Sequence, residues 1–283
     1  MNEMILHALR CPVCHSDLEI GNHGKSLVCL GGEKRHHCYD FSSAGYVNFA
    51  PPSQSHSGDS KEAVRSRTNF LEKGFYTPVR NAIAEAVKKY SSGLTVDAGC
   101  GEGYYTNGIS EFSKAVIGFD LSKYGVDAAA KKAGKNHIAN VFFGVAGIYD
   151  MPLFDNCVDG IVSIFAPCAT GEFNRVLKEN GVLIVAGAGK DHLLGMKSAV
   201  YEAVYRNTER VDMPTNMERV EEKEIKYNIS LSDNQEIMNL FSMTPYYYRT
   251  SETDFAKLKG MDKLTTPVNV FVRVYRKKKG VQI

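Results

Sequence analysis

The chain has 283 residues, 43% of them hydrophobic and 23% charged, with a formal net charge of +2. This length predicts two folded units, one of about 100–200 residues and one smaller, and the near balance of charge excludes a strong overall attraction to nucleic acid. No apolar run approaches the roughly 18 residues of a membrane span, the beginning is too short and polar for a signal peptide, and the seven cysteines fit a reducing compartment. We therefore expect a cytoplasmic protein with no membrane partner.

Metal-ligand residue types gather in the first 40 positions. Cys11 and Cys14 form a C-x-x-C turn, which sets two thiolates on one side of a tetrahedral ion, and Cys29 offers a third. The spacing leaves the fourth ligand open among three adjacent residues, His36, His37 and Cys38. So short a segment has little core of its own, so we predict a zinc ribbon over residues 1–50 that the metal holds together.

Residues 51–90 are predicted to connect this ribbon to a larger domain. Proline, serine and glycine are concentrated between Ala50 and Asp59, which is typical of a linker. From Asp59 or Ser60, either of which could serve as the N-cap, the pattern predicts one or two helices up to residue 90, interrupted at residues 73–78.

Residues 91–283 are predicted to form an α/β domain, because strand and helix patterns alternate. The predicted strands are 94–98, 115–120, 140–145, 158–165 and 182–186, and the predicted helices are 104–112, 123–133 and 171–177. This alternation indicates a Rossmann-like, doubly wound sheet. The tail predicts a strand at 225–230, a helix at 232–241 capped by Ser232, and a long strand at 268–275 that we expect at an antiparallel edge of the sheet.

A glycine-rich turn follows the first strand of this domain. Gly99, Gly101 and Gly103 let the backbone turn tightly and approach a ligand closely before the next helix begins. Such turns serve dinucleotides, phosphates and S-adenosylmethionine alike, so neighbouring residues must decide between them.

Three acidic residues favour S-adenosylmethionine. Asp97 and Glu102 flank the turn and would repel a pyrophosphate, whereas the ammonium and sulfonium groups of S-adenosylmethionine are cationic. Asp120 ends the next strand about 20 residues later, where a ribose is held. The sequence therefore predicts a methyltransferase site that includes Asp97, Gly99, Gly101, Glu102 and Asp120.

Beyond the ribbon and the turn, several short segments are specific to one family. They are Gly45-Tyr46-Val47-Asn48, Arg67-x-x-Phe70-Leu71-x-x-Gly74-x-Tyr76-x-Pro78, Asp120-Leu-Ser-Lys123, Phe165-Ala-Pro167, Arg175-Val-Leu and Met243-Thr-Pro245. With them the chain resembles, nearly end to end, the bacterial 23S rRNA guanine-N1 methyltransferases, which combine a zinc ribbon with a class I methyltransferase domain.

The resemblance implies zinc ligands at Cys11, Cys14, Cys29 and His37. It also implies cofactor contacts by Tyr76, by the Gly101-Glu102 pair and by His192. The loop before His37 is longer than the short spacing typical of the family, which leaves His36 or Cys38 open as the fourth ligand. The implied activity is S-adenosylmethionine-dependent methylation of guanine N1 in a hairpin loop of 23S rRNA.

The sequence singles out no catalytic base. Asp150, Asp155, Glu172 and His192 follow strands, although ordinary loop acids are expected at the first three positions. Basic residues interleaved with aromatic ones near the domain junction are candidates for contacts with RNA. These are Lys61, Arg65, Arg67, Lys73 and Arg80.

Two other readings share parts of this pattern. A class I methyltransferase acting on a small, quinone-like molecule would need the same cofactor pocket, but it gives no reason for the ribbon. A non-catalytic zinc-ribbon protein could bind RNA without turnover, yet the acids and glycines expected for the cofactor are intact. The sequence leaves the oligomeric state open, a homodimer included.

Overall fold

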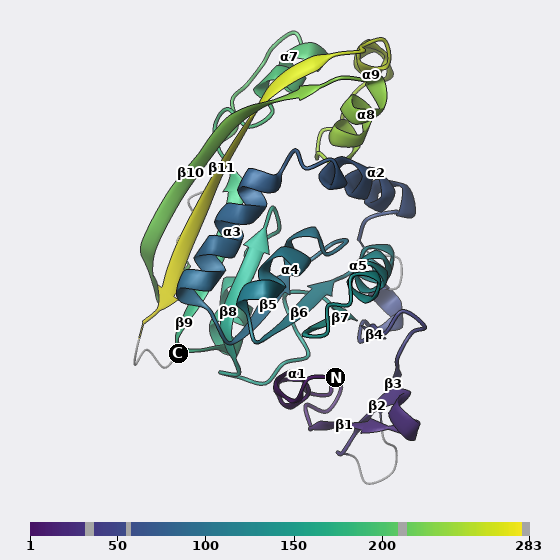
Figure 1. The fold of residues 1–283 in the computed structure, drawn as a ribbon, viewed down its shortest axis with the longest axis vertical. Coiled ribbons are helices and arrows are strands. Elements are labelled where there is room, and N and C mark those ends of the chain that lie inside the picture. Colours follow the sequence, from purple (N-terminus) through teal and green to yellow (C-terminus); the bar gives the residue numbers. More distant parts are fainter. Residues whose placement is uncertain (32–36, 55–57, 209–213, 279–283) are drawn as a thin grey trace.

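The computed structural model describes residues 1–31, 37–54, 58–208 and 214–278, and an eight-stranded sheet dominates it (Figure 1). The order is β10-β11-β9-β8-β5-β6-β7-β4. The parallel strands are β4 (Val47–Asn48), β5 (Leu94–Ala98), β6 (Ala115–Asp120), β7 (Val141–Val145), β8 (Val158–Ile164) and β9 (Leu177–Ala188). This confirms the predicted Rossmann-like α/β fold.

Alternate residues of the central strands supply two cores, one on each face of the sheet. Val116 and Val162 join the core under α3 (Thr77–Tyr90) and α4 (Tyr104–Ile109). Their neighbours Ile117 and Ile161 join the core that includes α1 (Glu3–Ala8) and α6 (Thr170–Val176). Strands buried on both faces read as continuous apolar runs, which is why these segments are apolar throughout.

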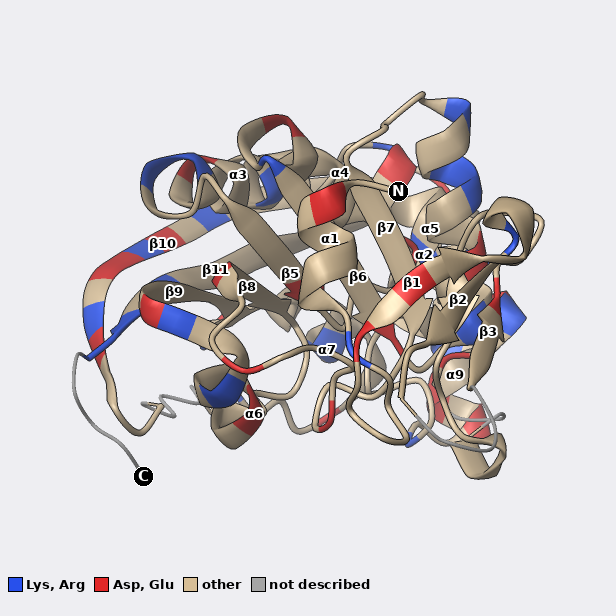
Figure 2. Ribbon diagram, turned by 90° about the horizontal axis from the view of Figure 1, so that it is seen from below, with Lys and Arg blue, Asp and Glu red and all other residues tan. Residues whose placement is uncertain are grey.

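The tail differs from the prediction in its strand order. β11 (Leu264–Lys277) pairs with β9 on one side and with β10 (Met217–Leu231) on the other, so β10 and not β11 forms the edge. Lys and Arg alternate with Asp and Glu along β10 (Figure 2), which discourages edge-to-edge pairing with another chain. The long apolar alternation of residues 268–275 therefore belongs to an interior strand.

Between these two strands the chain forms α8 (Asn234–Ser242) and α9 (Glu252–Lys259). The prediction that Ser232 caps α8 is wrong. Asp233 holds that place and accepts the N–H of Glu236 at 2.8 Å, while Ser232 donates its hydroxyl to the Glu236 carboxylate. Asp233 lies next in the sequence and is equally suited to cap a helix.

Two helices form the predicted connection before the sheet. α2 (Lys61–Glu72) begins at Ser60, which caps it by accepting the N–H of Ala63 at 3.2 Å, and α3 follows after the break. α2 packs against α8 and against α5 (Lys123–Lys135), and α7 (Leu194–Val200) packs on β11. Among the described residues, no helix combines the length and apolarity that crossing a bilayer requires.

The N-terminal segment forms a small antiparallel sheet of β1 (Leu18–Gly21), β2 (Ser26–Cys29) and β3 (Cys38–Asp40). This segment packs directly against the large sheet. Ile5 and Leu9 are buried in the same core as strands β5 and β6, and β4 joins the large sheet although it precedes the predicted boundary at residue 50.

Candidate functional site

Four metal-ligand side chains of the N-terminal segment converge. Ligand atoms of Cys11, Cys14, Cys29 and His37 all lie within 4.8 Å of one another. Cys14 Sγ is 3.1 Å from Cys29 Sγ, and Cys11 Sγ is 3.5 Å from His37 Nδ1. A zinc tetrahedron with Zn–S bonds of about 2.3 Å has edges of roughly 3.7 Å, so the cluster needs little adjustment to hold the ion. Three thiolates and one imidazole fill all four positions and fit a structural zinc.

The surroundings of the cluster also suit a closed metal site. Cys11 and Cys29 are fully buried, and the hydroxyl of Tyr39 lies 3.2 Å from Cys11 Sγ. Hydrogen bonding by Ser16 lowers the pKa of Cys14 to about 6, which favours the thiolate. Cys38 is exposed and is not part of the cluster, and His36 lies outside the described residues.

The glycine turn lies at the carboxyl end of β5 and uses backbone conformations that favour glycine. Gly99, Gly101 and Gly103 have φ values of 86°, 52° and 76°. A Cβ on Gly99 would lie 2.8 Å from the Cβ of Ala166, and one on Gly103 would lie 2.8 Å from that of Ala129. At these two glycines the backbone therefore packs directly against Ala166 and Ala129, with no room for a side chain.

Asp120 joins this turn to the end of β6. One carboxylate oxygen accepts the N–H of Gly101 at 3.0 Å, and the other accepts the N–H of Ser122 at 2.7 Å. Burial raises the pKa of Asp120, while these two hydrogen bonds oppose that shift. Each oxygen keeps a second lone pair, which suits acceptance from two adjacent ribose hydroxyls.

The sequence suggested that both acids of the turn present a free negative charge to the ligand. The structure shows that each of them is engaged within the protein. Asp97 is buried and accepts the hydroxyl of Thr106 at 2.6 Å, and burial raises its pKa to about 7. Glu102 is only 4% exposed and accepts Arg67 Nε at 2.5 Å, while Arg67 Nη1 donates to Asp59 at 2.5 Å. Sequence reasoning placed Arg67 among the RNA contacts and missed this inward ion pair, which spans 35 positions.

Tyr76 and His192 form a second part of the site. The backbone N–H of Asn269 donates to His192 Nδ1 at 3.2 Å, so the neutral ring carries its proton on Nε2, 3.4 Å from the Tyr76 hydroxyl. Burial lowers the pKa of His192 to about 4. Phe165 stacks on the imidazole at 5.6 Å and remains 46% exposed, which leaves an open aromatic face beside the pair.

Both parts lie where Rossmann-like sheets bind ligands. Phe165 follows β8 and the segment of His192 follows β9, as the glycine turn follows β5. The structure thus brings all of the predicted cofactor residues to the carboxyl edge of the sheet.

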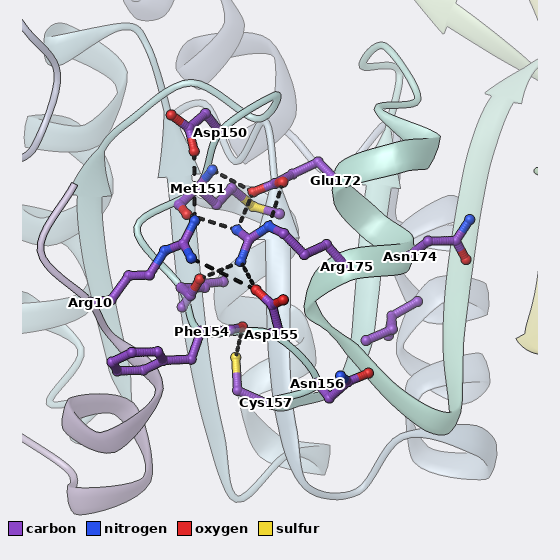
Figure 3. Close-up of polar contacts among 12 residues, drawn as sticks. Arg10, Asp150, Met151, Phe154, Asp155, Asn156, Cys157, Glu172, Asn174 and Arg175 are labelled. Atoms are coloured by element: carbon purple, nitrogen blue, oxygen red, sulfur yellow. Dashed lines mark hydrogen bonds and ion pairs between the residues drawn. The ribbon is translucent and has the colours of Figure 1, made fainter. Parts of the chain in front are cut away.

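The acids considered as candidate bases lie elsewhere, in an ion-pair network with two arginines (Figure 3). Arg175 donates to Glu172 at 2.6 Å and to Asp155 at 2.7 Å, and Arg10 approaches Asp155 at 3.7 Å and Asp150 at 3.9 Å. Glu172 also accepts the N–H of Met151. These contacts tie Glu172 and Asp155 to Arg175, whereas Asp150 remains largely exposed.

Most of the basic candidates for RNA contacts are engaged within the protein. Lys73 pairs with Glu236, and the Arg80 guanidinium lies 5.0 Å from the ring centre of Tyr104. Lys61 and Arg65 are exposed on α2, and neither has an ion pair to another residue in the part of the chain that the structure describes.

Residues 91–247 match the model of a methyltransferase domain. The chain is 34% identical, over 94% of its own length and 95% of the relative's, to YxjB of Bacillus subtilis (strain 168), whose name carries a provisional assignment as a 23S rRNA (guanine-N(1)-)-methyltransferase. The chain belongs to the 23S rRNA (guanine-N1)-methyltransferase family.

A second member of this family comes from Streptomyces fradiae and is named a 23S rRNA (guanine(748)-N(1))-methyltransferase. It is 28% identical over 71% of this chain and 70% of its own. The solved structure of YcgJ from Bacillus subtilis superposes on 71% of this chain and 98% of its own, with 16% identity and a TM-score of 0.52, and so shares the fold. As a member of the family, the chain is an S-adenosylmethionine-dependent methyltransferase, with a Cys/His cluster that fits zinc.

Proposed function

We propose that this protein transfers the methyl group of S-adenosylmethionine to N1 of a guanine in a hairpin loop of 23S rRNA. The observation that carries the proposal is the 34% identity to YxjB over 94% of the chain, and the Cys/His cluster that fits zinc supports it. A small-molecule methyltransferase would need the glycine turn but not the N-terminal cluster. Ribosomal RNA as substrate places the enzyme in the cytoplasm, and one chain supplies all of the proposed cofactor residues without a homodimer.

In this proposal the cofactor lies along the carboxyl edge of β5 and β6. Asp120 accepts hydrogen bonds from the ribose, and the backbone of Gly99 and Gly101 contacts the ligand closely. Asp97 adds negative potential behind the turn when ionised. Tyr76 and His192 border the cofactor as well, and Glu102 contributes from the turn beside Gly101.

The chemistry asks mainly for alignment. S-adenosylmethionine supplies a methyl group already activated on a sulfonium, so the protein must place guanine N1 in line with the S–CH₃ bond and exclude water. N1 lies on the pairing edge and bears a proton, so the base must be unpaired when it enters. His192 is unsuited to take that proton, because its free nitrogen Nε2 already carries one. The exposed face of Phe165 offers a surface on which the base can stack.

Incubation with labelled S-adenosylmethionine and 23S rRNA transcribed without modifications tests the proposal. We expect label in the RNA and a reverse-transcription stop at one guanine in a hairpin loop, because a methyl on N1 blocks pairing. Asp120→Ala should abolish both by loss of cofactor binding. Label in a metabolite fraction with none in RNA would support the small-molecule alternative, and binding of rRNA without any label would support the non-catalytic one.

A further inference from the structure

Two loops at the end of the molecule where α7, α8 and α9 meet carry exposed tyrosines. Tyr205 is 79% exposed in the loop after α7 (residues 201–208), and Tyr247 and Tyr248 are 40% and 71% exposed in the loop after α8 (residues 243–250). α9 packs against both α7 and α8, so the two loops belong to the same end of the fold (Figure 1). We call these three side chains the tyrosine surface. Aromatic rings left in solvent mark candidate interaction sites.

Lys197 joins the two loops. Its ammonium donates to the backbone carbonyl of Tyr205 at 3.1 Å and to the side-chain oxygen of Asn207 at 2.6 Å, and it lies 5.0 Å from the ring centre of Tyr246. The Tyr246 hydroxyl donates to the same oxygen of Asn207 at 3.0 Å. The tyrosine surface therefore extends from two loops that contact each other.

The rings of the second loop are held in place by other rings. Tyr247 makes T-shaped contacts with Phe241 of α8 and Phe255 of α9, with ring centres 5.9 and 6.1 Å away. Tyr248 meets the Tyr247 ring edge-to-face at 5.2 Å. A ring that is already held loses little conformational entropy when a flat group stacks on it.

The first loop is tied to the edge of the sheet that carries the proposed active site. The side-chain nitrogen of Asn207 donates to the backbone carbonyls of Gly189 and His192 at 3.1 and 3.0 Å. The His192 ring in turn stacks on Phe165, the exposed ring proposed to receive the target base. A strand whose target base lies at Phe165 can therefore continue toward the tyrosine surface.

The two loops and the lysine that joins them carry a positive balance of charge. Residues 201–208 and 243–250 contain two arginines and a single acid, Glu202. The Lys197 ammonium is largely buried, yet the hydrogen-bond acceptors that the structure gives it are neutral. In the described part of the chain, neither Lys190 nor Arg249, both exposed, forms an ion pair. The surface therefore favours an anionic partner.

Flat rings beside unpaired cations suit an unpaired RNA strand. Bases stack on tyrosine with little regard to sequence, and phosphates are attracted to the cations. A duplex keeps its base faces within its own stack, so it offers them to tyrosines much less. A lipid surface is disfavoured, because the two loops contain no leucine, isoleucine or phenylalanine to insert.

We propose that the tyrosine surface binds unpaired nucleotides of the RNA substrate that lie next to the target guanine. Tyr205 and Tyr248 stack on bases, and Arg249 contacts a phosphate. This inference rests on the proposed function, since it extends the same RNA beyond the edge of the sheet where the methyl group is transferred.

Replacement of the rings tests the proposal. By fluorescence anisotropy with a labelled single-stranded oligoadenylate, we expect Tyr205→Ala and Tyr248→Ala each to bind about 5- to 100-fold more weakly than wild type, as for the loss of one stacked base. Tyr205→Phe and Tyr248→Phe keep the ring and should bind within about twofold of wild type. Tyr124→Ala, which removes an exposed tyrosine of α5, should leave the affinity unchanged.

Salt dependence and kinetics separate the roles further. Arg249→Gln should reduce the slope of log affinity against log salt concentration by about 0.7, because one phosphate contact with a single strand is lost, whereas Tyr248→Ala should keep the wild-type slope. In methylation of 23S rRNA, the two alanine variants should raise KM and leave kcat unchanged. Their affinity for S-adenosylmethionine, measured by calorimetry, should equal that of wild type.

Other outcomes would overturn the proposal. Unchanged RNA affinity in the alanine variants would do so, as would equal weakening by alanine and phenylalanine, which would assign the effect to the hydroxyl groups. A change in sedimentation without a change in RNA affinity would assign the surface to contact between two copies of the chain.

The result can be separated from that of the proposed function. Weaker RNA binding in the alanine variants, with rRNA left unlabelled by wild type, supports the tyrosine surface and overturns the methylation of rRNA. Labelled rRNA with an unchanged KM in these variants overturns the tyrosine surface alone. A wild-type protein that neither binds oligoadenylate nor labels rRNA overturns both.

Discussion

At the scale of single residues, the site depends on groups whose charge is set by burial. His192 is kept neutral, and Glu102 is neutralised by Arg67. Asp97 is buried, and in the described part of the chain only the hydroxyl of Thr106 forms a hydrogen bond with it. Asp97 is therefore the residue whose charge costs most to maintain.

Asp97→Asn removes this charge, so it should change how the free energy of unfolding depends on pH. Burial raises the pKa of Asp97 from 3.8 to about 7, so the folded protein binds more protons than the unfolded chain between these values. The free energy of unfolding of the wild-type protein is therefore highest when Asp97 is protonated at low pH, and it falls as the pH rises toward 7. In urea unfolding, we expect the variant to gain about 1–3 kcal/mol relative to wild type between pH 5 and pH 8.

The comparison has an internal control. Asp127 is half-buried on α5 and pairs with Lys131 four residues along that helix, so Asp127→Asn should change the free energy of unfolding by less than about 1 kcal/mol. An equal difference between Asp97→Asn and wild type at both pH values would mean that Asp97 titrates normally.

At the scale of elements, the sequence predicted those with a strong local pattern. β5, β6 and the glycine turn lie where the apolar runs and glycines indicated, and Ser60 caps α2. The sequence analysis missed the short helices α7 and α9, because they lie outside the strand–helix alternation that located the equally short α4 and α6. The interior place of β11 was missed because strand order depends on pairing partners.

The site shows the same division. Asp97, Gly99 and Asp120 follow from local spacing, but Tyr76 and His192 entered only through resemblance, since a tyrosine or histidine alone usually has no ligand. The Arg67–Glu102 pair joins a helix to a turn far along the chain, and no local pattern records it. His37 and Cys38 are adjacent in the sequence, and only the fold shows that His37, and not Cys38, joins the cluster.

Removal of one zinc ligand tests the N-terminal element. Cys14 is exposed, so Cys14→Ser leaves the core intact while it takes away one of four ligands. We expect less than one zinc per chain and fast hydrogen exchange over residues 11–31 and 37–41, with β5 to β9 still protected. Cys38→Ser, an exposed cysteine outside the cluster, should keep one zinc. Stoichiometric zinc in Cys14→Ser would contradict the assigned set.

At the scale of the whole molecule, the N-terminal segment is tied to the large sheet by packing and by charge. Leu9 and Phe49 are buried with residues of β5 and β6. Arg10 and Arg175 share Asp155, so the network in Figure 3 links the segment before the metal cluster to the loop after β7 and to α6. The segment that carries the Cys/His cluster is thus connected to the large sheet by apolar packing and by ion pairs.

Arg175→Met should show how much this ion-pair network contributes to the stability of the folded protein. The guanidinium donates to two carboxylates and to the backbone carbonyls of Met151 and Leu153, and its loss leaves Glu172, which is 9% exposed, without its cation. We expect a loss of about 2–4 kcal/mol in the free energy of unfolding by urea. We also expect faster hydrogen exchange over residues 3–10, because Arg175 no longer holds the loop that carries Asp155, the ion-pair partner of Arg10. Arg219→Met, which breaks a surface pair with Glu222, should cost under about 1 kcal/mol. Equal losses in the two variants would mean that the network acts only as surface charge, and protection of residues 3–10 would then come from the apolar packing of Leu9 alone.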